Sequence, residues 1–195
     1  AFIEGLDLAL RRFGVILLGG DTVRVPAGAP RSFGLTAIGR APPGGAPTRG
    51  GVRPGDQLWV TGTIGNAGLG LAMRLGQEDA NETCLAAYRR PQPQLTFGQA
   101  VARYVHAMMD VSDGLLIDAR RMAEASGCQL GIMLESVPLS AALLAVRPDV
   151  LDTRLAAATA GDDYELLFAA DPGAAAAIRE IAAGLNVRAT PPGHA

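Results

Sequence analysis

The sequence predicts a mixed α+β fold, and three observations lead to that class. Some stretches carry apolar residues at helical spacing, and shorter continuous apolar runs, typical of buried strands, lie between them. Gly and Pro separate the two kinds of segment: the chain of 195 residues contains 25 Gly and 13 Pro. It is 49% hydrophobic but only 5% aromatic, which is typical of a soluble α/β or α+β core built from small side chains.

The first part of the chain predicts one helix and two strands. Phe2–Phe13 has apolar residues close to helical spacing, and Gly14 can cap such a helix. Val15–Leu18 is a short apolar run that predicts a buried strand, and Ser32–Ile38 predicts another. A Pro/Gly-rich loop, Ala41–Pro47, follows.

The remainder predicts alternating strands and helices. The expected strands are Gln57–Thr61, Ala107–Asp110, Gln129–Leu134 and Tyr164–Ala170, and the expected helices are Ala67–Leu75, Leu95–Val105, Leu115–Ala125, Ala141–Ala145 and Gly173–Ala183. The polar stretch 76–83 and the two prolines of 90–93 predict a domain boundary or hinge in this region. Ala189–Ala195 shows no periodic signal.

Charge, cysteines and hydropathy exclude several classes of function. Seventeen basic and nineteen acidic residues give a net charge of -2, so nucleic acid is not an expected partner. Cys84 and Cys128 lack the spacing of a zinc site or a disulfide framework. No apolar run is long enough to span a membrane, and the start does not have the pattern of a signal peptide. We therefore expect a cytoplasmic protein that binds no membrane.

The segment Leu18–Thr22 places Asp21 directly after two glycines at the end of an apolar run. Glycine lets the backbone approach a ligand closely, and a carboxylate there can hold a cation that carries phosphate. The alternative is an aspartate that organises a turn. The local pattern leaves both interpretations open.

The segment Met109–Leu115 contains Asp110, Ser112 and Asp113 in four consecutive positions, followed by a helical pattern. Asp110 and Ser112 are two residues apart, so in an extended chain they project to one face. Two carboxylates and a hydroxyl suit Mg²⁺ and phosphate, and a helix N-terminus also favours an anion. The alternative is that Asp113 is an N-cap and Asp110 a turn residue at the end of a strand.

Three further patterns are weaker. Gly62, Gly65 and Gly68 fit neither common phosphate-loop spacing, so turns and close packing are the better interpretation. Arg49 lies in a Gly-rich loop, where it could clamp phosphate or simply be solvated. The acidic segment Gly161–Glu165 precedes a strand and is compatible with turn chemistry or a ligand role. Neither histidine nor cysteine lies near a nucleophile motif, so covalent catalysis is not expected.

Taken in order, the motifs resemble the thiamine-monophosphate kinase family, which belongs to the superfamily of aminoimidazole ribonucleotide synthetase. The matching segments are Gly19–Thr22, Thr36–Gly39, Arg49 with Pro54–Asp56, Val60–Gly62, Tyr88–Pro93, Met109–Leu115 and Gly161–Phe168. The resemblance implies part of an N-terminal ATP-binding domain of β-barrel type over residues 1–47. A C-terminal α/β sandwich domain would follow over residues 48–195.

The resemblance also implies a reaction and a set of binding residues. The γ-phosphoryl group of ATP would be transferred, with Mg²⁺, onto thiamine monophosphate to give thiamine diphosphate, the final step of thiamine diphosphate biosynthesis. Asp21 and Asp110 would bind Mg²⁺, and Asp113 would hold a further Mg²⁺. ATP would contact Gly20, Asp21, Arg49 and Ser112. Asp162 stands where the family usually has a glutamate that contacts the thiamine substrate.

Two motifs of the family have no counterpart in this sequence: an N-terminal Gly-Asp-Asp region and a C-terminal aromatic residue near the substrate. We therefore expect the chain to be a piece that is inactive alone, from a full-length protein that is a homodimer. Two alternatives stay open. One is a relative that uses ATP to activate another small substrate, and the other is a non-catalytic nucleotide-binding chain.

Overall fold

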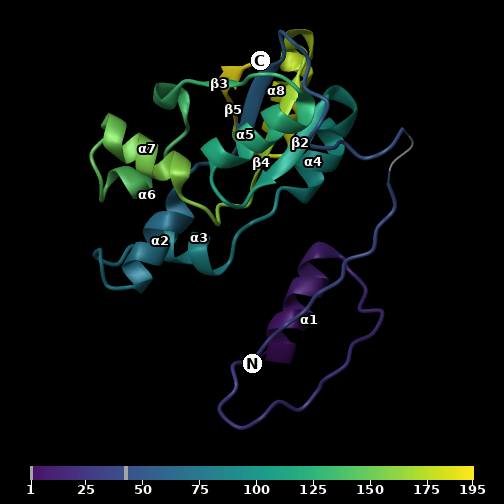
Figure 1. Ribbon diagram of the computed structural model, residues 1–195, viewed down its shortest axis with the longest axis vertical. Coiled ribbons are helices and arrows are strands. Elements are labelled where there is room, and N and C mark those ends of the chain that lie inside the picture. Colours follow the sequence, from purple (N-terminus) through teal and green to yellow (C-terminus); the bar gives the residue numbers. More distant parts are fainter. Residues whose placement is uncertain (1, 42–43) are drawn as a thin grey trace. The chain divides into compact units, whose positions relative to one another are not determined.

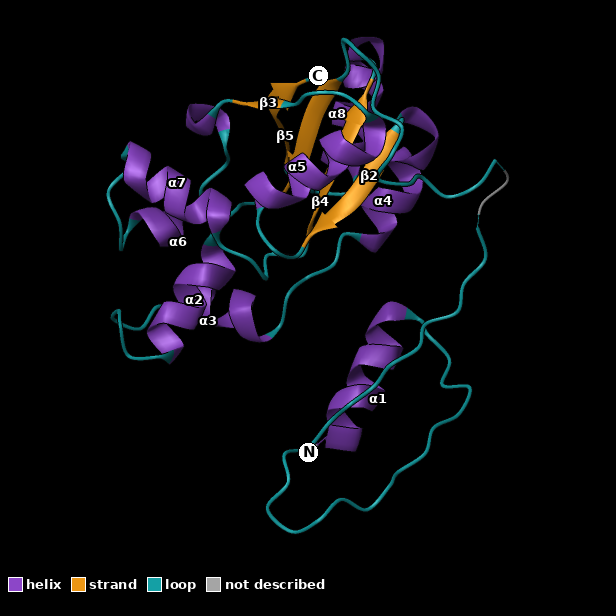
Figure 2. Ribbon diagram, in the orientation of Figure 1, coloured by secondary structure: helices purple, strands orange, loops and turns teal. Residues whose placement is uncertain are grey.

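The computed structural model describes residues 2–41 and 44–195, which form two compact units, 1–40 and 41–195. Pro42 and Pro43, part of the expected Pro/Gly-rich loop, lie outside the described residues. Figure 1 names the helices and strands, and Figure 2 separates them by type.

Among the described residues of the first unit, one helix forms and no strand does. Helix α1 (Phe2–Phe13) has the predicted bounds, and the Phe2 ring stacks on Phe33 at a centroid distance of 4.4 Å. The strands expected at Val15–Leu18 and Ser32–Ile38 are wrong, since both segments are irregular and exposed. A strand satisfies its backbone groups only against another strand, and neither segment pairs with one in this part of the chain.

The second unit is built on a five-stranded antiparallel sheet with the order β2-β4-β1-β5-β3. The strands are β1 (Gln57–Thr61), β2 (Ala107–Val111), β3 (Gly131–Ile132), β4 (Glu165–Ala170) and β5 (Ala189–His194). Strands β1, β2 and β4 agree with the sequence to within a residue. Strand β3 is shorter than the expected 129–134.

Alternate residues of the strands face two separate cores. Leu58, Val60, Leu167 and Ala169 belong to the core on one face, which contains residues of helix α5 (Leu115–Ser126). Trp59 belongs to the core on the other face, where α4 (Leu95–Val101) and α8 (Ala175–Gly184) pack (Figure 1). Side chains that alternate along a strand are therefore buried on both faces of the sheet, as expected for a sheet covered by helices on both sides.

Trp59 and Phe168 pair directly across β1 and β4 in the second core. Their rings are parallel within 5° at a centroid distance of 6.2 Å, and neither residue is exposed. Arg179 belongs to α8, and its guanidinium lies 5.2 Å from the centroid of the Trp59 ring. This cross-strand pair is the centre of the smaller core.

Four further helices lie beyond the sheet: α2 (Asn66–Arg74), α3 (Glu82–Arg89), α6 (Ala141–Leu144) and α7 (Leu151–Thr159). Helices α2 and α6 were expected, whereas α3 and α7 were not. Helix α3 packs against α2, and both belong to the same compact unit as the sheet, so the hinge expected between residues 76 and 93 is wrong.

Strand β5 contradicts the expectation of no regular structure after Ala189. It pairs with β1 at Ala189, Thr190, Gly193 and His194, but the register shifts between Leu58 and Val60. The prolines 191 and 192 lie at this irregularity, where a strand can tolerate residues that lack an N–H donor. Prolines that usually argue against a strand are thus accommodated by a bulge.

Candidate functional site

One edge of the sheet collects the acidic segments of the second unit. Strands β1 and β2 both run antiparallel to β4, so the ends of β1 and β2 meet the start of β4. Val111 pairs with Glu165 in register, and the Thr61 hydroxyl donates to the Glu165 carboxylate at 2.6 Å. The segments 62–65, 112–114 and 161–164 therefore meet at this edge, which we call the acidic edge.

The two motifs predicted from the sequence lie against each other there. The Asp162 amide donates to the Ser112 carbonyl at 2.8 Å, and the Tyr164 amide donates to the Val111 carbonyl at 2.8 Å. Asp162 and Tyr164 have φ values of 69° and 51°, a left-handed conformation that is costly for residues other than glycine. A Cβ added to Gly161 would lie 2.7 Å from the Ser112 carbonyl oxygen, so the chains approach too closely for a side chain.

Asp118, a residue that the sequence analysis did not single out, organises the segment 112–114. Its side chain is fully buried, and its Oδ2 accepts hydrogen bonds from the amides of Ser112 (3.0 Å), Asp113 (3.0 Å) and Gly114 (3.3 Å). This carboxylate lies in the first turn of α5 and so satisfies donors that would otherwise be unpaired. The alternative in which Asp113 is the N-cap is wrong, because Gly114 occupies the N-cap position and Asp118 binds the amides.

Arg121 links Asp118 to Asp113. Its Nη1 donates to Asp118 Oδ1 at 2.9 Å and also forms an ion pair with the Asp113 carboxylate. Asp118 is buried, whereas Asp113 is more than half exposed, so the guanidinium connects an internal carboxylate with an external one.

Asp110 faces away from this group. Along β2, Met109 and Val111 belong to the core on the α5 side and Met108 to the other core, so by alternation Asp110 shares the face of Met108. Asp110 is exposed, and within the described residues its carboxylate makes no hydrogen bond or ion pair. Asp110 and Asp113 therefore present their carboxylates on different sides of the acidic edge.

Asp163 connects the acidic edge to helix α2. Its carboxylate accepts the amides of Gly65 (2.7 Å) and Ala67 (3.2 Å) at the N-terminus of that helix. Burial raises the pKa of Asp163 to about 7; the two amides counteract this shift, and the carboxylates of Glu165 and Asp162 add to it. Asp163 thus has a structural role, the turn chemistry that the sequence left open.

Glu165 is held in the same region. Burial raises the pKa of its carboxyl group, and the hydrogen bonds from Thr61 and Gln94 oppose that shift. The Thr61 hydroxyl, fully buried, also accepts the Leu166 amide at 2.8 Å. Glu165 thus helps to fasten β4 to β1.

The glycines at 62, 65 and 68 allow close packing, as the sequence indicated. An added Cβ would lie 1.9 Å from the Glu165 Oε1 at Gly62, and 2.4 Å from the Ala157 Cβ at Gly65. At Gly68 it would lie 2.3 Å from the Ala160 Cβ. The absence of a side chain at Gly65 and Gly68 lets α2 approach the end of α7, and its absence at Gly62 makes room for the Glu165 carboxylate.

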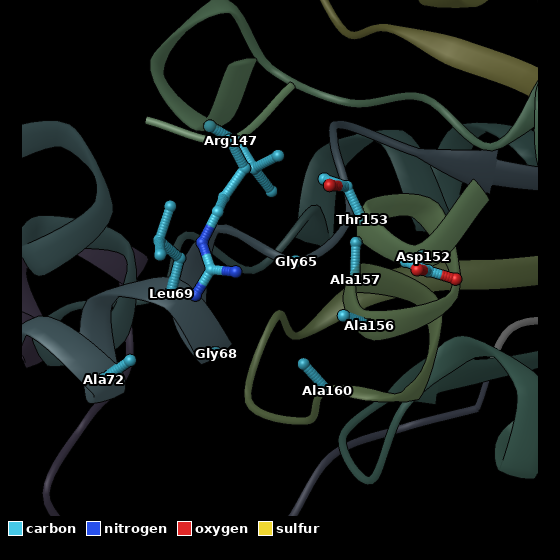
Figure 3. A pocket seen from close by; sticks show the side chains of 11 residues that line it. Gly65, Gly68, Leu69, Ala72, Arg147, Asp152, Thr153, Ala156, Ala157 and Ala160 are labelled. Atoms are coloured by element: carbon cyan, nitrogen blue, oxygen red, sulfur yellow. The ribbon is translucent and has the colours of Figure 1, made fainter. Parts of the chain in front are cut away.

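A cavity of about 450 Å³ opens between α2, α6 and α7. Figure 3 shows Arg147 extending into it toward Gly65 and Gly68, with alanines of α7 on the opposite side. The guanidinium of Arg147 also forms an ion pair with Glu78. The lining residues are Gly65, Gly68, Leu69, Ala72, Leu143, Arg147, Asp152, Thr153, Ala156, Ala157 and Ala160.

Arg49 lies away from Ser112 and Asp113. Its carbonyl accepts the Ser126 hydroxyl at 3.4 Å, and the neighbouring Thr48 carbonyl accepts the Met108 amide at 2.9 Å. Ser126 ends α5 and Asp113 precedes its start, so the backbone of Arg49 is separated from Asp113 by the twelve residues of that helix, about 18 Å. The Arg49 side chain is exposed.

Gly20 and Asp21 belong to the first unit, in an exposed segment without regular structure. The Thr22 amide, that of the next residue, donates to Asp21 Oδ1 at 2.7 Å. Within residues 2–41 and 44–195, His, Cys, Asp and Glu side chains form no group of three that could hold a metal ion. No helix in the same residues is long and apolar enough to cross a membrane.

Comparison with known proteins decides the family. Residues 53–195 match the family described as AIR synthase related protein, C-terminal domain. The chain belongs to this family. The mixed α/β fold expected from the sequence is thereby confirmed.

The most informative relatives are named thiamine-monophosphate kinase, which confirms the resemblance. The protein from Caulobacter vibrioides is 41% identical over 191 residues, 96% of this chain and 54% of the relative. That from Salmonella typhimurium is 35% identical over 173 residues, 86% of this chain and 52% of the relative. The chain thus spans about half the length of the curated relatives it matches.

Solved structures agree with this family assignment. Thiamine-monophosphate kinase from Stenotrophomonas maltophilia has a TM-score of 0.71 at 32% identity and covers 76% of this chain and 49% of that one. A structure named AaThiL, complexed with AMPPCP and TMP, has a TM-score of 0.62 at 28% identity, with coverages of 75% and 46%.

Proposed function

We propose that this chain contributes to an ATP-dependent kinase that converts thiamine monophosphate to thiamine diphosphate with Mg²⁺, the final step of thiamine diphosphate biosynthesis. The observation that carries the proposal is the direct contact of the 112–114 and 161–164 segments at the acidic edge, in a chain 41% identical to a thiamine-monophosphate kinase. The AaThiL structure that holds AMPPCP and TMP supports ATP and thiamine monophosphate as ligands. We also propose a cytoplasmic location and a homodimeric full-length protein.

The donor set at the acidic edge fits Mg²⁺ in part. Mg²⁺ typically uses one or two carboxylates and completes its shell with water and phosphate oxygens. The carboxylate of Asp110, which is exposed and has no hydrogen-bond or ion-pair partner among the described residues, meets that requirement. Asp21 is the other ligand proposed, on the family resemblance. Asp113, proposed for a further Mg²⁺, would have to exchange its Arg121 partner for the ion. When bound, the ion would neutralise phosphate charge.

The proposed ATP contacts at this edge are restricted by the hydrogen bonds already made. The amides of residues 112–114 are bound to Asp118, and the first amides of α2 are bound to Asp163. The amides of residues 112–114 already have this acceptor, so a phosphate beside them would have to compete with the Asp118 carboxylate. The side-chain hydroxyl of Ser112 is the group proposed to contact ATP, together with Gly20 and Arg49.

Asp162 is the proposed contact for the thiamine substrate. Its backbone is held by the hydrogen bond from its amide to the Ser112 carbonyl and has a left-handed conformation. The Asp162 Cα is therefore held close to Ser112, the proposed nucleotide contact. Aspartate is one methylene shorter than glutamate, so Asp162→Glu tests reach without changing charge. Phosphoryl transfer needs positioning and charge neutralisation rather than a covalent nucleophile, which agrees with this arrangement.

The decisive experiment complements a thiamine-monophosphate kinase deletion strain with the complete reading frame that contains this sequence. When the protein encoded by this reading frame is purified and incubated with ATP and thiamine monophosphate, chromatography of the reaction mixture should show thiamine diphosphate. Asp110→Asn should abolish turnover, whereas Glu124→Gln, on the exposed face of α5, should not. We expect the 195-residue chain alone to show little or no turnover.

Two other outcomes would replace the proposal. Phosphate release with a different small substrate, and none with thiamine monophosphate, would indicate a relative of another specificity. Calorimetry that detects an ATP analogue bound with Mg²⁺, in a complete protein without turnover, would indicate a nucleotide-binding protein that is not an enzyme.

A further inference from the structure

The Asp118 carboxylate is unusual because it is fully buried and yet contacts an exposed functional segment. One oxygen binds three consecutive amides, and the other binds Arg121. Buried carboxylates are rare unless they are paired and hydrogen-bonded. Within the described residues, the side-chain hydrogen bonds of Asp118 go to the 112–114 amides and to Arg121, the residue that pairs with Asp113, and not to the side chains of Asp110, Ser112 or Asp113.

We propose that Asp118 and Arg121 are positioning residues for the Asp110–Gly114 segment. Asp118 fixes the backbone of residues 112–114 to helix α5, and Arg121 fixes the side chain of Asp113 to the same helix. The inference deepens the proposed function, because the fixed segment carries the groups proposed to bind Mg²⁺ and ATP.

The geometry explains why both residues are needed. The hydrogen bonds from three backbone amides to one oxygen of Asp118 determine the path of the backbone, but they leave the Asp113 side chain free to rotate. Arg121 removes that freedom, since its guanidinium is bonded to Asp118 and to Asp113 at once. Arg121 thereby engages the Asp113 carboxylate, whereas Asp110 has no such partner among the described residues.

A consequence for cation binding follows from the shared guanidinium. A divalent ion at Asp113 competes with Arg121 for the same carboxylate, of which Arg121 binds Oδ2. Removing the guanidinium should therefore strengthen cation binding at Asp113, even though it loosens the segment. A residue that served only the stability of α5 would not have this effect.

The chain provides a matched control one residue away. Arg120 lies on the same helix and pairs with Glu124, but it is exposed, and among the described residues it forms no hydrogen bond or ion pair with the 112–114 segment. Arg120→Gln and Arg121→Gln change the net charge equally and alter the same helix. Any difference between the two variants reports the contacts of Arg121.

The test measures amide hydrogen exchange of residues 112–114 in the 195-residue chain, without ligand, and Mn²⁺ binding by electron paramagnetic resonance. In Asp118→Asn we expect these amides to exchange at least tenfold faster, with helix α8 unchanged. In Arg121→Gln we expect Mn²⁺ to bind about three- to fivefold more tightly than in Arg120→Gln, and Arg121→Lys should restore the original affinity in part.

The outcomes separate this proposal from the proposed function. Unchanged exchange of residues 112–114 in a folded Asp118→Asn variant would overturn the positioning role. If that variant does not fold, equal exchange of these amides in Arg121→Gln and Arg120→Gln would overturn it. Equal Mn²⁺ affinities of the two arginine variants would refute the competition at Asp113. Absence of Mn²⁺ binding in every variant would count against the proposed Mg²⁺ site, and the exchange data would still decide the positioning role.

Discussion

Replacing Asp163 by asparagine should remove much of the pH dependence of stability between pH 5 and pH 8. Asp163 is held by the amides of Gly65 and Ala67 in a site whose burial raises its pKa to about 7. In the unfolded chain the same carboxyl group titrates near its ordinary value of 3.8. Between these two values the folded protein binds more protons than the unfolded chain does.

The sign and size of the effect follow from this difference. Where the native state binds more protons, the free energy of unfolding falls as the pH rises. The contribution of Asp163 is fully present below pH 4 and is lost as the pH rises through 7. Each pKa unit corresponds to about 1.4 kcal/mol, so raising the pH from 5 to 8 should cost about 3 kcal/mol through this group.

The measurement is urea denaturation at pH 5 and pH 8 for the wild-type chain and for Asp163→Asn. Asparagine carries no charge at either pH and keeps one oxygen that can accept a hydrogen bond from an amide. The free energy of unfolding of Asp163→Asn should therefore change less between the two pH values than that of the wild type. Asp171→Asn is the control, because Asp171 also accepts a backbone amide, from Gly173, but is exposed. An equal pH dependence in the wild type and in Asp163→Asn would refute the reasoning.

Three further predictions concern the packing of the second unit. Gly62→Ala should lower the free energy of unfolding by about 1–3 kcal/mol in urea, because its Cβ would overlap the Glu165 carboxylate and φ is +60°; an unchanged midpoint would contradict this. Ser126→Ala removes the acceptor of two loop amides and should accelerate their hydrogen exchange, with a loss of about 1–2 kcal/mol. Trp59→Ala should cost about 3–5 kcal/mol, measured by thermal unfolding, because it leaves a cavity beside Phe168.

Local sequence pattern determined most of the regular structure of the second unit. Strand β1 and helices α2 and α5 form where the periodicity of apolar residues places them. The hydrophobic pattern that predicts each of these elements lies within the segment itself, so the prediction does not depend on neighbouring elements. The same pattern failed at Val15–Leu18, since an apolar run forms a strand only when another strand pairs with it.

The local pattern of apolar residues does not predict strand β5 or the role of Asp118. The prolines of β5 are tolerated only because β1 shifts its register opposite them. Asp118 did leave a signal, a carboxylate on the helix face shared with Leu115, Ala119 and Met122, all of which are buried. A charge at such a position requires partners, and periodicity alone does not name them.

The sequence by itself determined the alternation of strands and helices and the acidic motifs, because both depend on residues close together in the chain. Only the tertiary structure decided that the segments 112–114 and 161–164 contact each other and that Asp110 and Asp113 face different sides. It also decided that Arg49 lies at the far end of α5 from Asp113. These relations depend on strand order and helix packing, which bring distant residues together and which no local pattern encodes.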